Sequence, residues 1–275
     1  MALLLTAPDL HELLNGERPP IVLDVRWRLD RPDGRADFAA GHIPTAVYVD
    51  LDRELARHGD PADGRHPLPE LDDLQRAARS WGIDDGDTVV VYDDLGNLSA
   101  ARAWWLLTWA GLADVRLLDG GLAAWSAERA LETGPAHPRP GGVHLEAGHL
   151  PTITLDEAGA WPDGGVLLDA RAPERYRGEV EPIDPRAGHI PGALSAPTAG
   201  NTASDGRFLE PEALRVRFAE LGVTEGSEVA VYCGSGVTAS HEIVALTLAG
   251  FRPALYPGSW SQWSNHADRP VATGA

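Results

Sequence analysis

The sequence of 275 residues predicts an α/β protein made of two copies of one domain, each a mainly parallel sheet flanked by helices on both faces. The first observation is that short apolar, β-rich runs alternate with stretches whose apolar residues fall on one helical face. The second is that four landmarks of the first half return in the second half, in the same order. One match could arise by chance, whereas four in order indicate a duplicated domain.

The landmarks are short and lie at the ends of expected strands or at the starts of expected helices. They pair as follows: Leu23–Arg26 with Leu168–Arg171, Gly41–Pro44 with Gly188–Pro191, Val89–Asp93 with Glu228–Cys233, and Leu118–Trp125 with Tyr256–Trp263. A stretch rich in glycine and proline begins at Gly134 and shows no apolar periodicity, which is typical of a linker. We therefore expect a first domain over 1–133, a linker over 134–150, and a second domain over 151–275 that carries the chain's single cysteine.

Apolar spacing places the elements of each half in order. The first half predicts a helix over 71–81, a strand over 88–92 and a helix over 99–109; the second predicts strands over 166–169 and 229–232 and helices over 211–221 and 237–248. In such sheets ligands gather at the carboxyl ends of the strands. Cys233 and Asp93 directly follow equivalent strands, so we expect one at that edge in each half.

Composition excludes several functions. The 41 acidic residues against 23 basic ones give a net charge of −18, which disfavours nucleic acid and anionic membranes as partners, since both are bound through clustered Lys and Arg. No apolar run approaches the roughly 18 residues of a membrane span. A single cysteine cannot form an internal disulfide. The histidines are scattered without metal-ligand spacing. We expect a soluble cytoplasmic protein that needs no metal or cofactor.

The segment after the strand at 229–232 has the composition of an anion-stabilising loop. It runs Cys233-Gly-Ser-Gly-Val-Thr238 and leads into the expected helix. Gly234 and Gly236 let the backbone curl and point consecutive N–H groups inward, and the amino end of the helix adds its positive dipole end. We therefore expect Cys233 to react as a thiolate, the form that attacks sulfur.

Three other interpretations of Cys233 are less consistent with the residues around it. A free cysteine is most often a small buried apolar residue, but its place between a strand end and a Gly-x-Gly turn favours chemistry. A phosphate-binding loop of the Walker type would carry a lysine, which this loop lacks. A cysteine phosphatase would place an arginine six residues after the cysteine, where Ala239 stands.

Over essentially its whole length the chain resembles the tandem-domain sulfurtransferases of the rhodanese superfamily. The resemblance rests on the duplicated Gly-His-Ile-Pro segments, the Cys233 loop, and the segment Pro257–Trp263, in which Pro257 replaces a more usual Asp. In this family the first half has lost its cysteine, and here Asp93 stands in that place. Thiosulfate sulfurtransferases usually carry basic residues just after the cysteine. The uncharged loop here is instead similar to that of the 3-mercaptopyruvate sulfurtransferases.

The resemblance implies a donor-binding set near the thiolate. Arg175 matches the main substrate arginine of the family, and Asp169 would orient it as a second-layer partner. Arg171 is a weaker candidate, and Arg186 stands roughly where the family has a second substrate arginine. The remaining expected contacts to the donor are made by the loop itself, at Gly234, Gly236, Val237 and Thr238.

The resemblance also implies a proton-transfer set of Ser235, His66 and Asp52. Ser235 would relay a proton, His66 would act as the base, and Asp52 would hold the histidine tautomer. His42 and His189 recur in both halves, although only one half has the nucleophile, so we expect both to be structural and hydrogen-bonded to backbone.

The implied reaction is a two-step sulfur transfer. A small-molecule donor, 3-mercaptopyruvate, would load Cys233 with sulfur, and cyanide or a thiol acceptor such as thioredoxin would remove it. Three alternatives stay open at this point: thiosulfate as the donor, a non-catalytic persulfide carrier, and a redox sensor, the last disfavoured because no resolving cysteine exists.

Overall fold

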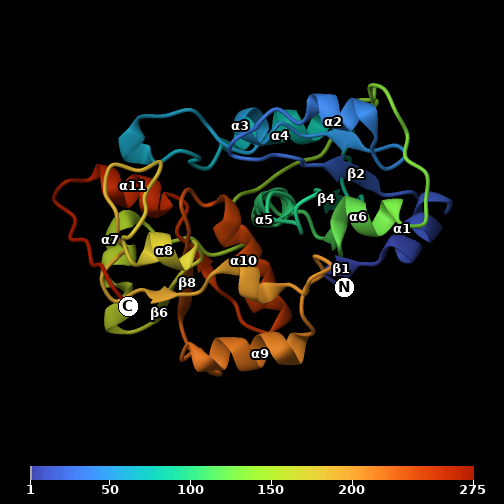
Figure 1. Ribbon diagram of the computed structural model, residues 1–275. Coiled ribbons are helices and arrows are strands. Elements are labelled where there is room, and N and C mark those ends of the chain that lie inside the picture. Colours follow the sequence, from blue (N-terminus) through green and yellow to red (C-terminus); the bar gives the residue numbers. More distant parts are fainter. Residues whose placement is uncertain (1) are drawn as a thin grey trace. The chain divides into compact units, whose positions relative to one another are not determined.

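The computed structural model describes residues 2–275 (Figure 1). The chain forms two compact units: the first contains Met1–Arg57, Pro69–Leu150 and Ser204–Phe208, and the second contains His58–Leu68, Pro151–Ala203 and Leu209–Ala275. The segment His58–Leu68 thus belongs to the second unit although it precedes the expected linker. Residues 134–150 are grouped with the first unit, where Gly141 N donates to Arg79 O at 2.8 Å.

The first unit is built on a five-stranded parallel sheet in the order β1-β5-β4-β2-β3. The strands are β1 (Leu4–Leu5), β2 (Ile21–Asp24), β3 (Val47–Tyr48), β4 (Val89–Tyr92) and β5 (Val115–Leu118). The helices are α1 (Ala7–Leu14), α2 (Arg35–Ala40), α3 (Leu51–Glu54), α4 (Leu71–Ser80), α5 (Ala100–Trp109) and α6 (Gly121–Ser126).

The second unit repeats this plan with a four-stranded parallel sheet in the order β7-β6-β8-β9. The strands are β6 (Val166–Asp169), β7 (Leu194–Ser195), β8 (Val229–Tyr232) and β9 (Ala254–Leu255). The helices are α7 (Leu155–Ala160), α8 (Pro173–Tyr176), α9 (Pro211–Glu220), α10 (Val237–Leu248) and α11 (Ser259–Asn265), with short 3-10 turns η1 (Pro61–Asp63), η2 (Trp161–Asp163) and η3 (Thr198–Asn201). Within residues 2–275 no helix has the length and apolarity needed to cross a membrane.

The elements expected from apolar spacing are confirmed. The strands over 166–169 and 229–232 and the helix over 237–248 have the expected bounds, and the other four elements differ from theirs by one residue at one end. Spacing succeeds here because β4 and β8 are buried along their whole length, so every position in them is apolar or aromatic.

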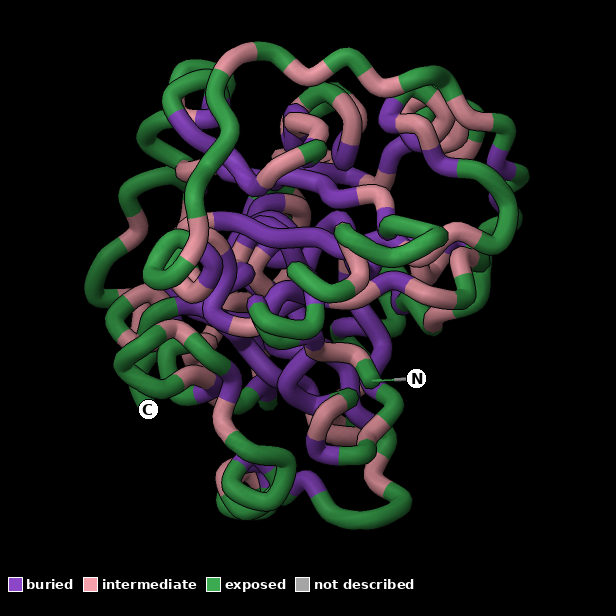
Figure 2. Tube along the Cα trace, turned by 90° about the vertical axis from the view of Figure 1, so that its right-hand side faces the viewer, coloured by how far each residue is buried: buried purple, intermediate pink, exposed green. Residues whose placement is uncertain are grey.

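Helices cover both faces of each sheet, as expected. In the second unit, one face of β6 and β8 packs against α7 and against Trp260 and Trp263 of α11, while α10 covers the opposite face and α9 packs on α10. In the first unit, α1, α2 and α6 pack on one face and α5 on β4 and β5. Figure 2 shows the buried chain in the interior and the exposed chain in surface loops and outer helices.

The duplicated histidines are structural, as expected. His42 Nδ1 lies 2.8 Å from Phe38 O, and His189 Nδ1 lies 2.7 Å from Tyr176 O. Each imidazole also stacks on an aromatic ring, Phe38 at 3.9 Å in one unit and Tyr176 at 3.8 Å in the other. The same two contacts in both units explain why the motif recurs where only one unit has a cysteine.

Candidate active site

The Cys233 loop connects the carboxyl end of β8 to the amino end of α10. Gly236 has a φ of +82°, a left-handed conformation that favours glycine, and its N–H donates to Cys233 Sγ at 3.1 Å. The Cys233 backbone is held from the other side, since its N–H donates to Ser259 Oγ at 3.2 Å and its carbonyl accepts from Trp260 N at 3.0 Å. The sulfur therefore lies against a backbone donor at the positive end of a 12-residue helix, an arrangement that stabilises an anion.

Ser235 and His66, which lie 169 positions apart in the chain, are in contact. His66 Nδ1 is 2.7 Å from Ser235 Oγ, and both residues are 8% exposed. The segment that carries the histidine is tied to α11, because Arg65 N donates to Ser261 Oγ at 3.1 Å and His266 Nε2 lies 3.0 Å from Ala62 O. The pair can pass a proton between a hydroxyl and an imidazole two residues from the thiol.

Three further residues of the expected site lie on helices. Val237 and Thr238 begin α10, with the Val237 side chain buried. Asp52 lies in α3 of the first unit, where its Oδ1 accepts a hydrogen bond from Trp27 Nε1 at 2.9 Å.

Two arginines border the loop on the side of Gly234. A Cβ atom at Gly234 would lie 3.1 Å from Arg65 Nη2 and 3.3 Å from Arg175 Nη1. Arg175, in α8, is paired with Glu181 at 2.7 Å and with Asp184 at 3.2 Å.

Arg65 joins the same cluster, because its Nη1 is paired with Asp184. Burial raises the pKa of the Asp184 carboxyl above its ordinary value, since desolvation outweighs the attraction of Arg65 and Arg175. Sequence reasoning missed Arg65; its only signal was its place directly before His66, which the family resemblance did place in the site.

The expected pairing of Asp169 with Arg175 is wrong. The carboxylate of Asp169 binds Arg171 instead, with Nη2 to Oδ2 at 2.6 Å and Nε to Oδ1 at 3.0 Å. Arg171 also donates to Gly188 O and lies 4.6 Å above the ring of Trp260. Its side chain is 1% exposed, so the weaker donor-binding candidate is a buried structural residue. Arg26 and Asp24 form the same pair in the first unit, at 2.7 Å, which explains the repeated Asp-x-Arg motif.

Arg186 is a structural arginine as well, contrary to its expected role. Its Nε donates to Ser264 O at 2.9 Å, its Nη1 to Arg269 O at 2.7 Å, and its Nη2 to both Trp263 O at 2.8 Å and His266 O at 2.7 Å. Four of the five N–H donors of a guanidinium are thereby used. The side chain anchors the segment after α11 and has little capacity left for a substrate carboxylate.

The equivalent loop of the first unit is filled by its own side chain. The buried carboxylate of Asp93 accepts hydrogen bonds from the backbone N–H groups of Leu95, Asn97, Ser99 and Ala100 at 2.7–3.0 Å. The carboxylate that these N–H groups bind stands at the position where the second unit has the thiol of Cys233. The first unit therefore keeps the anion-stabilising loop but has no nucleophile in it.

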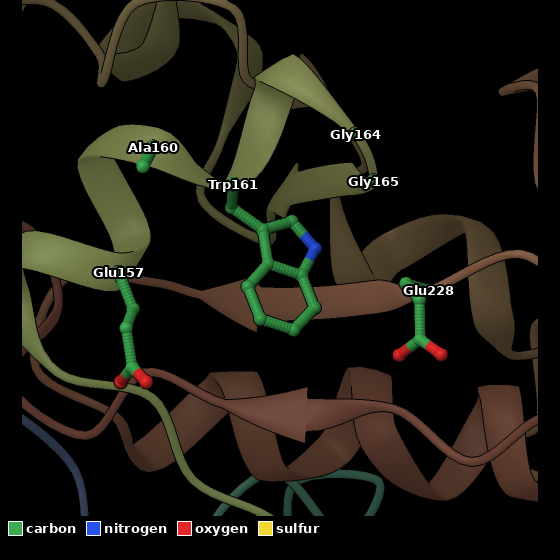
Figure 3. A pocket seen from close by; sticks show the side chains of 6 residues that line it. All are labelled: Glu157, Ala160, Trp161, Gly164, Gly165 and Glu228. Carbon is green, nitrogen blue, oxygen red and sulfur yellow. The ribbon is translucent and has the colours of Figure 1, made fainter.

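A cavity of about 320 Å³ lies at the opposite edge of the second sheet (Figure 3). Trp161 lines it together with Gly165 and Glu228, which directly precede β6 and β8. Its lining contains no thiol, no hydroxyl and no cation. Because it lies at the amino ends of the strands, it is unrelated to the Cys233 loop at the carboxyl ends.

Comparison with known proteins gives a match to the rhodanese-like domain twice, over residues 6–128 and 154–266. Over 98% of this chain and 97% of the relative, the chain is 49% identical to the "Putative thiosulfate sulfurtransferase SseB" of Mycobacterium tuberculosis. It is also 49% identical, over 99% of both chains, to the "Probable 3-mercaptopyruvate sulfurtransferase" of Pseudomonas aeruginosa.

Among solved structures, SseA of Escherichia coli, a 3-mercaptopyruvate sulfurtransferase, superimposes with a TM-score of 0.83 at 30% identity, covering 94% of this chain and 99% of that one. Both domain matches, the full-length relatives and the duplicated sheet agree with one another. The chain belongs to the rhodanese family of sulfurtransferases, with the family's domain present twice.

Proposed function

We propose that this protein moves sulfur from 3-mercaptopyruvate, through a persulfide on Cys233, to cyanide or a thiol acceptor, and releases pyruvate. The observation that carries the proposal is the Cys233 loop: the thiol meets the Gly236 N–H at 3.1 Å, and no residue from Gly234 to Thr238 is charged. An uncharged loop suits a donor with a single carboxylate that is bound outside the loop. The name of the Pseudomonas aeruginosa relative supports the same donor.

The first step forms one S–S bond and breaks one C–S bond. The Cys233 thiolate attacks the donor sulfur, and the electron pair of the C–S bond passes to carbon, so that pyruvate leaves as its enolate. A proton must then reach the enolate carbon. The Ser235 hydroxyl is the proposed donor of that proton. His66, whose Nδ1 lies 2.7 Å from Ser235 Oγ, then returns a proton to the hydroxyl.

The second step returns the enzyme to its starting state. The acceptor attacks the outer sulfur of the persulfide, and the Cys233 thiolate leaves. The Gly236 N–H and the amino end of α10 stabilise this thiolate as a leaving group, just as they stabilise it as a nucleophile. No cofactor takes part in either step.

The remaining site residues have supporting roles in the proposal. Arg175 would bind the donor carboxylate. This role is supported by the position of its Nη1, which lies 3.3 Å from where a Cβ atom on Gly234 would be, next to Cys233. The backbone N–H groups of Gly234, Gly236, Val237 and Thr238 would surround the transferred sulfur. Asp52 would fix the orientation of His66, a role supported by the family resemblance alone.

The competing donor is thiosulfate, the substrate in the name of the Mycobacterium tuberculosis relative. Steady-state kinetics with cyanide as acceptor separate the two donors. We expect kcat/KM for 3-mercaptopyruvate to exceed that for thiosulfate by at least about tenfold. The reverse preference would refute the proposed donor.

A non-catalytic persulfide carrier would load sulfur without turning over. Intact-protein mass after exposure to 3-mercaptopyruvate should show the gain of one sulfur atom, lost when cyanide is added and absent in Cys233→Ser. Steady pyruvate release with cyanide supports an enzyme, whereas a single stoichiometric release would support a carrier.

Thioredoxin is the proposed thiol acceptor, and the cytoplasm the proposed compartment, where single cysteines stay reduced. Reduced thioredoxin should sustain pyruvate release in the absence of cyanide. A rate no higher than that with no acceptor would exclude thioredoxin from this role.

A further inference from the structure

Two guanidinium nitrogens converge on Gly234 of the Cys233 loop. Arg65 pairs with Asp184 through Nη1, and Arg175 pairs with Glu181 and Asp184 through Nε and Nη2. Within residues 2–275, neither Arg65 Nη2 nor Arg175 Nη1 has a hydrogen-bond acceptor. These are the two nitrogens that lie 3.1 and 3.3 Å from a Cβ position on Gly234.

The Nε atom of Arg65 is also unsatisfied. It is buried and, in the described part of the chain, has no acceptor. Buried N–H groups are nearly always hydrogen-bonded, so this one requires a polar partner from outside the described chain, either a water molecule or a bound ligand. Arg65 and Asp184 also line a cavity of about 350 Å³ in the second unit.

We propose that Arg65 is the second donor-binding arginine of this enzyme, and that Arg65 Nη2 and Arg175 Nη1 hold the donor carboxylate between them beside Cys233. The proposal rests on the proposed function for the identity of the donor. A carboxylate offers two oxygens with about four acceptor sites, so two guanidinium groups can bind it at once. Arg186, which the family resemblance suggested for this role, is committed to backbone carbonyls.

Asp184 is the positioning residue for both arginines. Its two oxygens bind one arginine each, Oδ1 to Arg65 and Oδ2 to Arg175. Together with Glu181 it gives the cluster two carboxylates against two guanidinium groups, so their charges cancel. A cluster of this kind suits a donor with one negative charge better than a dianion such as thiosulfate.

The direct test removes the Arg65 guanidinium. In Arg65→Met, Arg175 keeps its ion pairs with both Asp184 and Glu181, so Asp184 is not left without a partner. We expect KM for 3-mercaptopyruvate and the inhibition constant of pyruvate each to rise about 10- to 100-fold, the value of a charge-assisted hydrogen bond, with kcat changed less than threefold. Arg177→Met is the matched control, because Arg177 is an exposed arginine paired with Glu179. Both constants should stay within twofold of wild type in that variant.

The outcomes separate the two proposals. A folded Arg65→Met enzyme with KM and inhibition constant within twofold of wild type would overturn the role of Arg65, whatever the donor. A wild-type preference for thiosulfate would refute the proposed donor, whatever Arg65 does.

A second, more conservative variant tests the proposal if Arg65→Met does not fold. If circular dichroism shows that Arg65→Met is unfolded, Arg65→Lys keeps the charge but loses the planar fork that reaches Gly234 and Asp184 together. We expect its KM to rise at least about fivefold, and an unchanged KM would contradict the proposal. Asp184→Asn should raise the ratio of kcat/KM for thiosulfate to that for 3-mercaptopyruvate at least about threefold; an unchanged ratio would show that Asp184 does not set the charge preference.

Discussion

Glu242 on α10 should make the stability of the second unit depend on pH in the direction opposite to most carboxylates. Its side chain is fully buried; Oε2 accepts a hydrogen bond from Asn201 Nδ2 at 2.6 Å, and Arg217 Nη1 lies 3.6 Å from Oε1. Burial raises the pKa of Glu242 to about 7, because the loss of hydration outweighs the attraction of Arg217 and the hydrogen bond from Asn201.

The size of the effect follows from this shift. In the unfolded chain the carboxyl titrates near 4.5, so between about pH 4.5 and 7 the folded state binds more protons than the unfolded state. Stability therefore falls as the pH rises through this window, by about 3 kcal/mol in all, and about 2.5 kcal/mol of that loss falls between pH 5 and pH 8. Below pH 4.5 both states are protonated and the loss vanishes.

Glu242→Gln removes the titration while keeping an oxygen that can accept from Asn201. Urea unfolding followed by tryptophan fluorescence gives the free energy of unfolding of both proteins at pH 5 and pH 8. We expect the difference in free energy of unfolding, variant minus wild type, to increase by about 2.5 kcal/mol from pH 5 to pH 8. Glu220→Gln, at an exposed position of α9, is the control and should show no such gain. Parallel pH dependence of wild type and Glu242→Gln would refute the reasoning.

Three further predictions concern the Cys233 loop, its neighbour His66 and the equivalent Asp93 loop. Ser235→Lys should raise kcat/KM for thiosulfate relative to 3-mercaptopyruvate, since it places a cation beside the thiol; an unchanged ratio of the two specificity constants would contradict the role of the uncharged loop. His66→Asn should lower kcat for pyruvate release about 100-fold, because the Ser235 hydroxyl loses the imidazole that returns its proton. A decrease in kcat of less than threefold would argue against this role of His66. Asp93→Ala should lower the free energy of unfolding in urea by at least about 3 kcal/mol without lowering kcat, because four backbone N–H groups, three of them buried, lose their acceptor. An unchanged free energy of unfolding would contradict that account.

Much of the fold and the expected nucleophile could be predicted from local patterns. Strands such as β4 and β8 are buried on both faces, so their burial is visible as unbroken runs of apolar and aromatic residues. The duplication was visible because Asp-x-Arg and Gly-His-Ile-Pro perform the same structural task in both units, as the pairs Asp24–Arg26 and Asp169–Arg171 show. The loop around Cys233 was recognisable since its two glycines and the following helix are contiguous in sequence.

The partners of several charged side chains were decided by tertiary structure. An arginine carries the same local signal whether its guanidinium meets a substrate, a carboxylate or a row of carbonyls. Arg171 is a buried structural residue and Arg186 a partly buried one. Asp169 pairs with Arg171 and not with Arg175, and Arg65 lies beside Gly234 although it comes from a segment that precedes the second sheet in the chain. The physical reason is range: periodicity and loop chemistry depend on neighbours along the chain, whereas the partners of Arg65 and Arg186 depend on which distant segments the folded backbone brings within about 4 Å.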